Sequence, residues 1–418
     1  MMPSFLKTIR NGRSAARDRY LVNFLRDRDA YHVPAAMSAT NKLECLITDI
    51  YYDRAPYFLK KTLLRGIEDH RSDRLSSVEV RNCYTSAAIQ IFDKLITKGK
   101  FDLSYHADRA LGRATKRYFD ISPTSMFLYS GYALESFRAA RGTDVRKLLF
   151  LFHPHHKLIS DILKADMDAY PQFRSSFEAD LEVSGSWRHH RADEELALAD
   201  GVVAASGFSL KSAAYFGSTA PKYAVPYFTE VAPNPEPYSL RSDGQARFLF
   251  VGQGIQRKGL HHLFMAWERA GLTDATLTCV CSRMHKTIAE ATPAGVQVKT
   301  NLSKEELQLE FDRAHVFVMP SLVEGFGLVY LEAQRRGAYV IGTTNTGLPD
   351  ITQDEELAVS LPAGQIEPLT QMLVIQYNRI MKGMIDHKAI VEFSEKYRFD
   401  QYALAMSEAI SKIESNKM

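Results

Sequence analysis

The sequence contains few cysteines, with 4 among 418 residues. Four cysteines are too few for a disulfide framework in a chain of this length. Cys279 and Cys281 alternate within the apolar run at residues 275–281. This pattern predicts buried, reduced residues of a β-strand rather than metal ligands.

The sequence also lacks a long hydrophobic run. No apolar stretch approaches the roughly 20 residues that a membrane-spanning helix needs. The N-terminal segment MMPSFLKTIRNGRSAARDRY is basic but has no apolar centre of the kind found in secretory signals. We therefore expect a cytoplasmic protein.

An excess of charge of one sign is missing as well, since the net charge is only +3. So small a net charge does not indicate a nucleic-acid-binding protein. The composition, 45% hydrophobic and 24% charged, is typical of a soluble globular protein.

The length of the chain suits two lobes, each with its own core. Predicted strands at residues 125–129 and 147–152 flank a predicted helix at 131–141, and this order indicates an α/β fold with parallel sheets covered by helices. Residues 52–120 have a mostly helical pattern. A proline-rich segment at 231–247 predicts a stiff linker before the second lobe. Ser303 and Glu306 have capping-box spacing and predict the start of a helix that ends near Arg313.

The most informative stretch is residues 314–350. A short apolar run at 316–319 predicts a buried strand, and a loop with Glu324, Gly325 and Gly327 follows it. Residues 328–336 have helical spacing, Gly337 ends the helix, and 338–342 predict a second buried strand. The first turn of such a helix has unpaired N–H groups and a partial positive charge, so it is a natural anion site.

In this context the segment PSLVEGFGLVYLEAQRRG resembles the Glu-x7-Glu signature of the family-4 retaining glycosyltransferases, which have the two-lobed GT-B fold. The resemblance implies that Glu324 faces the donor sugar and that Glu332 binds the ribose hydroxyls of the nucleotide. It also implies that backbone amides hold the donor phosphate and sugar at Gly325, Phe326, Gly327 and Leu328. In a purely structural alternative, Glu324 favours the helix dipole and Glu332 pairs with Arg336.

A second loop, VGQGIQRKG at residues 251–259, follows the predicted strand at 248–252. It lacks the third glycine of a dinucleotide-binding fingerprint. It resembles instead the Val-Gly…Lys-Gly loop of the same family, which implies that Gly252 and Gln253 approach the donor and that Lys258 pairs with its diphosphate. Many family members have an arginine where this chain has Gln253, and Arg257 is the candidate to supply that charge. The alternative is a solvated basic pair on the surface.

Histidines follow the predicted strand at 147–152, in the order His153-Pro154-His155-His156. Ligands of open α/β sheets bind beyond the carboxyl ends of the strands, so His153 is well placed for a site. The resemblance implies that a histidine in this region contacts the donor sugar. The alternatives are a His-rich surface loop and a metal site, although the sequence shows no matching partner cluster.

The resemblance implies a domain order of an acceptor-side Rossmann-like lobe (1–240), a nucleotide-sugar lobe (241–396) and a terminal helix (397–418) that crosses back to the first lobe. An apolar stripe suits that docking and comprises Phe399, Tyr402, Met406, Ile410 and Ile413. The implied enzyme transfers a hexose with retention to a glycan, glycolipid or small molecule in cell-envelope polysaccharide synthesis. It needs neither a cofactor nor a metal.

Other interpretations remain open. Metal-dependent glycosyltransferases of the other major fold use Asp-x-Asp, which occurs here at 27–29 and at 166–168. A nucleotide-sugar epimerase and a non-catalytic subunit that binds a partner or a glycan are further alternatives. The basic residues near the N-terminus could contact an anionic membrane surface from the cytoplasmic side, and they are Lys7, Arg10, Arg13, Arg17 and Arg19.

Overall fold

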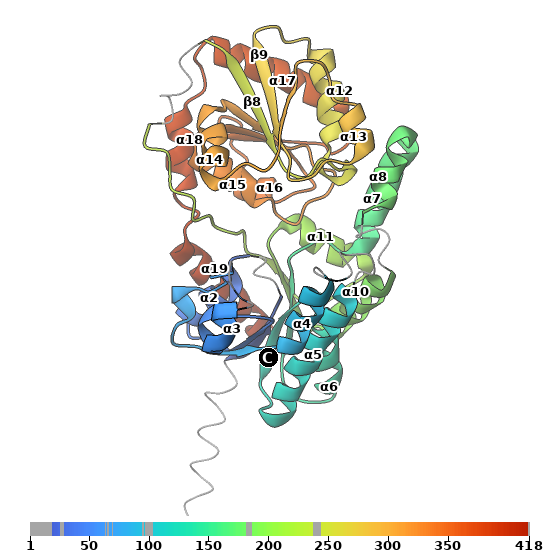
Figure 1. Ribbon diagram of the computed structural model, residues 1–418, viewed down its shortest axis with the longest axis vertical. Helices are drawn as coiled ribbons and strands as arrows, with labels where there is room; N and C mark the ends of the chain where they lie inside the picture. Colours follow the sequence, from blue (N-terminus) through green and yellow to red (C-terminus); the bar gives the residue numbers. More distant parts are fainter. Residues whose placement is uncertain are drawn as a thin grey trace, which may run out of the picture.

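The computed structural model describes residues 19–25, 29–62, 64, 67–68, 70–93, 96, 103–180, 186–236 and 244–416. Two lobes are stacked along the long axis, each built on its own parallel sheet (Figure 1). The predicted boundary between residues 240 and 241 lies outside the described residues. Within the described part, no helix has the length and apolarity required to cross a bilayer.

The first sheet has, within the described residues, seven parallel strands in the order β3-β2-β1-β4-β5-β6-β7. Its central strands are buried along their whole length, which explains their continuous apolar runs. The strands are β1 (Tyr20–Asn23), β2 (Leu43–Thr48), β3 (Glu79–Asn82), β4 (Ser125–Tyr129), β5 (Lys147–Leu151), β6 (Gly201–Ala204) and β7 (Lys222–Ala224).

The second sheet has six parallel strands among the described residues, in the order β10-β9-β8-β11-β12-β13. The buried strands β11 and β12 pair side by side at its centre, beside β8. The strands are β8 (Ala246–Val251), β9 (Ala275–Val280), β10 (Gln297–Lys299), β11 (Val316–Val318), β12 (Tyr339–Thr343) and β13 (Ala358–Leu361).

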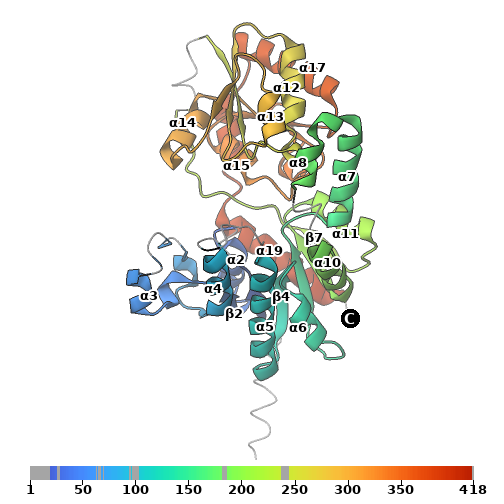
Figure 2. The same ribbon diagram turned by 45° about the vertical axis from the view of Figure 1, so that its right-hand side comes forward.

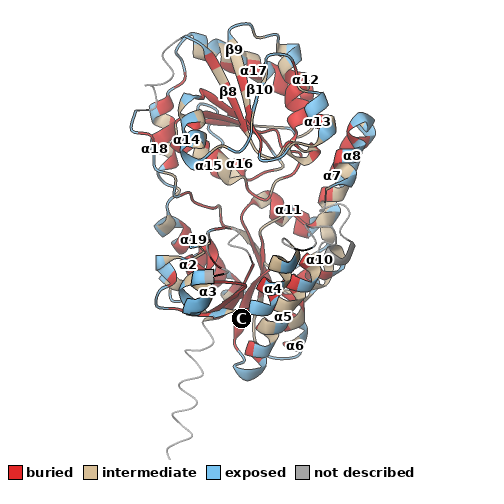
Figure 3. Ribbon diagram, in the orientation of Figure 1, coloured by how far each residue is buried: buried red, intermediate tan, exposed pale blue. Residues whose placement is uncertain are grey.

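Helices cover the sheets and present their buried sides to them (Figure 3). In the first lobe these are α2 (His32–Ala39), α3 (Tyr57–Thr62), α4 (Tyr84–Phe92), α5 (Ser104–Ile121), α6 (Leu134–Ala139), α7 (His156–Ala169), α8 (Arg174–Glu178), α10 (Ser186–Leu198) and α11 (Gly207–Phe216). In the second lobe they are α12 (Leu260–Ala270), α13 (Lys286–Glu290), α14 (Lys304–Arg313), α15 (Leu328–Arg335), α16 (Leu348–Ile351), α17 (Ile366–Met381) and α18 (His387–Ser394).

The last helix, α19 (Phe399–Ser415), returns to the first lobe and packs beside α2 (Figure 1). Most of its apolar stripe is buried, including Tyr402, Met406 and Ile410. Near its end, Glu414 accepts a hydrogen bond of 2.7 Å from the hydroxyl of Tyr20. This contact ties the end of the chain to the first strand.

The lobes touch through α7, α8 and α11, and α7 rises from the first lobe to lie along the second (Figure 2). A small apolar cluster joins them. It consists of Ile159, Leu163 and Phe208 from the first lobe and Leu322 and Val323 from the second. The contact fixes the loop before Glu324 against the first lobe.

Most strands and helices appear where the sequence predicts them, because their apolar runs are buried. The capping box forms as predicted: Ser303 and Glu306 exchange side-chain and backbone hydrogen bonds at the start of α14. The mostly helical pattern of residues 52–120 concealed β3, which is an edge strand with alternating exposure. The sequence analysis also missed the short strand β10.

Candidate active site

A cleft of about 720 Å³ lies between the lobes, at the carboxyl ends of strands from both sheets. This is where parallel α/β sheets bind ligands. The first lobe lines the cleft with Asp29, Tyr129, Phe152, His153 and Tyr227. The second lobe contributes Gly252, Gln253, Arg257, Lys258, Glu324, Phe326, Gly327, Leu328 and Glu332, together with neighbouring residues of the same loops. Of the predicted site residues, only Gly325 does not line the cleft.

Two glycines shape the loop between β11 and α15. Gly327 precedes the helix with φ of 92°, a conformation that L side chains rarely adopt. Gly325 lies against the first lobe, where an added Cβ would sit 2.3 Å from the carbonyl oxygen of Phe152. The loop thereby brings the start of α15, at Leu328, to the cleft with its partial positive charge.

Lys258 and Glu324 form an ion pair in this cleft. They meet because the N–H of Leu322 donates to the carbonyl of Arg257 at 2.9 Å, which holds the two loops together. Both side chains are largely buried. Burial alone would raise the pKa of Glu324, but the charges of Lys258 and its neighbours outweigh it and lower this pKa to about 2. Glu324 is therefore ionised at neutral pH.

Arg257 lies beside this pair and bridges the lobes. Its Nε is 3.2 Å from Oδ2 of Asp180 and its Nη1 is 3.3 Å from Nε2 of His153. His153 follows the end of β5, so the predicted histidine and the predicted cation meet across the cleft. The guanidinium donates in this contact, so the Nε2 of His153 accepts.

Glu332 faces the cleft from the second turn of α15. Its predicted structural alternative, an ion pair with Arg336, is wrong. Arg336 instead forms a bidentate ion pair with Asp312, in which both N–O distances are 2.6 Å. Burial raises the pKa of Glu332. A partly buried carboxyl beside a cavity is a typical ligand-binding group.

Gln253 lines the cleft directly after Gly252 at the end of β8. Its side-chain oxygen accepts a hydrogen bond of 3.1 Å from Arg283. This arginine, in the loop after β9, was missed by the sequence analysis. Its guanidinium lies next to the position where an arginine was expected, because β8 and β9 are neighbouring parallel strands.

The first-lobe face contains a buried carboxylate that the sequence analysis did not assign to the site. Oδ2 of Asp29 accepts hydrogen bonds from the hydroxyls of Tyr129, at 2.6 Å, and Tyr227, at 3.3 Å. Burial raises the pKa of Asp29 to about 6, although both hydroxyls counter that effect. The three residues come from distant segments, so no local sequence pattern connects them.

The two Asp-x-Asp segments do not form a common site among the described residues. Asp27 lies outside the described residues, and Asp29 is held by the two tyrosines. Asp166 is buried away from the cleft lining and accepts a hydrogen bond of 2.6 Å from Gln256, while Asp168 is exposed.

Solved structures show which fold class the two lobes define. A sucrose-phosphate synthase from Thermosynechococcus elongatus aligns with 95% of this chain and 100% of its own, with a TM-score of 0.63 and 15% identity. Anabaena Alr3699/HepE in complex with UDP and glucose aligns with 94% of this chain and 100% of its own, with a TM-score of 0.57 and 14% identity. The protein thus has the predicted GT-B fold.

Sequence comparison places the family likeness in the second lobe. Residues 245–376 match the family described as Glycosyl transferases group 1. A Klebsiella pneumoniae protein called "Uncharacterized 41.2 kDa protein in cps region" is 30% identical over 106 residues, which are 25% of this chain and 30% of that protein. The Arabidopsis thaliana sulfoquinovosyl transferase SQD2 is 32% identical over 118 residues, covering 25% of this chain and 23% of its own. The chain therefore spans less than a third of the length of either relative.

Proposed function

We propose that this protein is a retaining glycosyltransferase that moves a hexose from a nucleotide-diphosphate sugar to an acceptor hydroxyl. The observation that carries the proposal is the convergence of Lys258, Glu324 and the start of α15 in one interlobe cleft, within the part of the chain that matches the glycosyltransferase family.

The second-lobe face suits the donor. Lys258 and Arg257 provide positive charge for the diphosphate, and the first amides of α15 add donors for its oxygens. Glu332 is the candidate to hold the ribose hydroxyls. HepE has been solved in complex with UDP, with UDP and glucose, and with UDP-glucose, so UDP-sugars are the first donors to test.

The Lys258–Glu324 pair has a direct role in this mechanism. A donor diphosphate competes with Glu324 for the ammonium of Lys258. The carboxylate of Glu324 is then released toward the sugar, where it stabilises positive charge as the glycosidic bond breaks. Lys258 stabilises the negative charge that grows on the leaving nucleoside diphosphate. His153 approaches the donor sugar from the first lobe.

The first-lobe face suits an acceptor with hydroxyl groups, such as a glycan or glycolipid. Asp29 can accept a hydrogen bond from a hydroxyl, and Tyr129 and Tyr227 hold its carboxylate in place. Sugar hydroxyls are commonly bound by such carboxylates because an ionised acceptor makes a strong hydrogen bond.

We also propose that the protein works at the cytoplasmic face of a membrane. Of the predicted basic residues, Lys7, Arg10, Arg13 and Arg17 lie outside the described residues, and Arg19 pairs with Glu44 at 3.1 Å. In addition, α3 exposes Tyr57 and Phe58 beside Lys60 and Lys61. Aromatic and basic side chains together favour an anionic lipid surface. Co-sedimentation with anionic liposomes is expected, and it should weaken in high salt and on deletion of residues 1–19. Equal binding to neutral liposomes, or none, contradicts this part of the proposal.

The catalytic step is expected to need no metal, because protein cations and helix amides neutralise the diphosphate. Initial rates should therefore be unchanged in excess EDTA. Loss of activity that manganese restores would instead favour the Asp-x-Asp alternative.

A mass-spectrometric screen of nucleotide sugars tests the activity itself. With no acceptor, slow hydrolysis of one donor class to nucleoside diphosphate and free sugar is expected. With acceptors, the anomeric configuration of the product, read by NMR, should match that of the donor. Isomerised donor without transfer would identify an epimerase, and nucleotide binding without any turnover would favour a non-catalytic subunit.

A further inference from the structure

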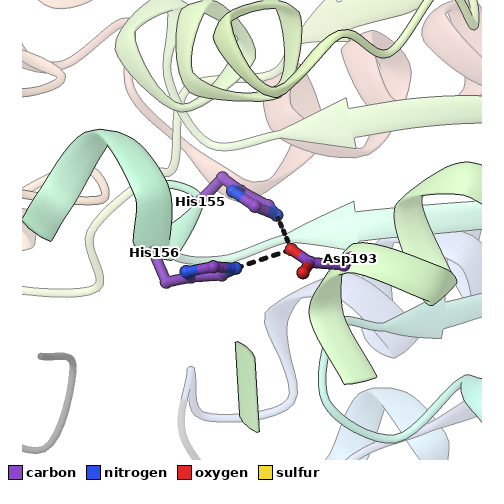
Figure 4. Close-up of side chains that lie close together, drawn as sticks. All are labelled: His155, His156 and Asp193. Atoms are coloured by element: carbon purple, nitrogen blue, oxygen red, sulfur yellow. Dashed lines mark hydrogen bonds and ion pairs between the residues drawn. The ribbon is translucent and has the colours of Figure 1, made fainter. Parts of the chain in front are cut away.

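A second group of titratable side chains lies in the first lobe, where α7 begins and α10 passes beside it. His155 and His156 project toward Asp193 of α10 (Figure 4). Their Nε2 atoms lie 3.1 Å and 2.6 Å from the same oxygen, Oδ1 of Asp193. The proposed donor chemistry uses none of these residues.

The surrounding structure holds both imidazoles in place. The backbone N–H of His155 donates to Oγ of Ser212 at 2.7 Å, and the centre of its ring lies 4.2 Å from the centre of the ring of Phe216. His189, one turn before Asp193 on α10, stacks flat on His156 with 4.0 Å between ring centres. A preorganised set of side chains is what a ligand site requires.

One ring nitrogen points to a missing ligand. The side chain of His155 is only 1% exposed, and its Nε2 has no hydrogen-bond partner of good geometry within the described structure. A buried polar nitrogen without such a partner costs stability unless another group binds it. Its 3.1 Å approach to Asp193 aims it into the space shared by the three side chains.

We propose that His155, His156 and Asp193 bind a divalent transition-metal ion, with Zn²⁺ as the best match. Two imidazoles and a carboxylate are a common zinc ligand set, with bonds of about 2.0–2.2 Å. The candidate ligand atoms all lie within 4.8 Å of one another. Bonds of that length in tetrahedral geometry separate ligand atoms by about 3.3 Å, so the two histidine–aspartate contacts of 3.1 Å and 2.6 Å need to lengthen by less than about 1 Å.

Access and tautomer are both compatible with the ion. The side chains of His156 and Asp193 are 18% and 34% exposed, which leaves a path from solvent. Binding through Nε2 puts the proton of His155 on Nδ1. Within the described residues, this proton displaces one hydrogen bond, the long contact of 3.4 Å that the backbone N–H of Lys157 donates to Nδ1.

A comparison cluster in the same molecule also has a buried ring nitrogen without a hydrogen-bond partner, Nε2 of His262, but it lacks the path from solvent. Asp166, His261 and His262 also lie close together, but all three are buried. Oδ2 of Asp166 already accepts from Gln256 at 2.6 Å and lies 3.0 Å from His261. That cluster is a closed contact between α7 and α12, and it serves as an internal control.

The proposed ion has a structural role. It would join the first turn of α7 to α10, two residues beyond His153, and so fix the end of β5 at the cleft. The ion is not needed for sugar transfer, so this inference does not depend on the proposed function.

Zinc binding by tag-free protein tests the proposal. The protein is stripped with EDTA, dialysed, and titrated with ZnCl₂ against a chromophoric chelator, and bound zinc is counted by plasma mass spectrometry. We expect one equivalent in the wild type and a higher melting temperature with zinc. His156→Ala and Asp193→Asn should weaken zinc binding at least tenfold and abolish the thermal shift, while near-UV circular dichroism verifies their folding.

Two matched variants complete the design. His190→Ala removes an exposed histidine from the same helix, and His262→Asn alters the comparison cluster. Both should keep one equivalent of zinc with wild-type affinity. No stoichiometric zinc in the wild type, unchanged affinity in both His156→Ala and Asp193→Asn, or loss of zinc in His262→Asn would each overturn the proposal.

Discussion

The two faces of the interlobe cleft are built in opposite ways. The second-lobe face carries Arg257 and Lys258 beside Glu324 and Glu332, and these residues come from two short segments, at residues 252–259 and 324–332. The first-lobe face centres on Asp29, Tyr129 and Tyr227. The two tyrosines lie 100 and 198 residues from Asp29 along the chain. A short loop can present a phosphate site by itself, whereas a polar surface for an acceptor is assembled only when distant strands meet.

The two buried carboxylates of the cleft show the same contrast in their pKa values. Burial would raise both. At Glu324 the adjacent cations prevail and hold the pKa at about 2, whereas the partners of Asp29 are uncharged hydroxyl and backbone N–H groups and its pKa rises to about 6. The carboxylate of Glu324 on the second-lobe face therefore stays ionised at neutral pH, whereas the carboxyl of Asp29 on the first-lobe face titrates near pH 6.

Removing the Lys258 cation from the second-lobe face should have the largest effect on turnover. Lys258→Ala loses a charge-assisted contact to the leaving diphosphate, which is worth about 2–4 kcal/mol, so turnover should fall by roughly 30- to 1,000-fold. Steady-state kinetics of sugar transfer measures this effect. Lys286→Ala, which removes an exposed lysine from the same lobe, should be close to wild type. Near-normal turnover in folded Lys258→Ala protein would remove Lys258 from the mechanism.

Disturbing the contact between the two lobes at Gly325 should have the next largest effect on turnover. In Gly325→Ala the new Cβ would clash with the carbonyl of Phe152, and strain of this kind costs about 1–3 kcal/mol. Denaturant unfolding should show lower stability and the kinetics lower turnover. Gly252→Ala is a milder comparison, since its Cβ would meet side chains alone, the ring of Phe250 at 3.3 Å and Sδ of Met319 at 3.9 Å. Equal stability of the two variants would contradict the close fit of the lobes at Gly325.

Changing the carboxyl of the first-lobe face should give a smaller effect that depends on pH. The folded pKa of Asp29, about 6, exceeds its ordinary value, so ionising Asp29 costs stability as pH rises from about 4 through 6, and the cost is constant above that. Asp29→Asn avoids this cost. We therefore compare the free energy of unfolding of Asp29→Asn with that of the wild type at each pH. The difference, variant minus wild type, should be more positive at pH 8 than at pH 4 by on the order of 2 kcal/mol.

Thermal unfolding at the two pH values measures the change, and Asp144→Asn, at an exposed position of the same lobe, provides the control. A stability difference between Asp29→Asn and wild type that stays constant between pH 4 and pH 8 would rule out a raised pKa at Asp29.

The same contrast explains how far the sequence could be interpreted. Buried strands such as β4 and β11, the capping box of α14 and the Gly325–Gly327 loop have local signals, because period, caps and turn glycines depend on near neighbours. The edge strand β3 has alternating exposure and a weak pattern. Arg283 reaches Gln253 only through the pairing of β8 with β9, and Asp29 reaches the cleft only through the packing of the first lobe. Similarly, the sequence places Asp193 37 residues from His156, so the partner of that histidine appears only in the folded chain.

Calorimetric titration with UDP, GDP and ADP tests most directly the central claim that the second-lobe face holds the nucleotide. The wild type should bind one of these nucleoside diphosphates. Glu332→Ala should weaken that binding about tenfold, equivalent to about 1.4 kcal/mol, because it loses contacts to the ribose. Asp29→Asn, on the opposite face, should bind within about twofold of the wild type. Absence of binding in the wild type, unchanged affinity in folded Glu332→Ala, or a larger loss in Asp29→Asn than in Glu332→Ala would contradict the account.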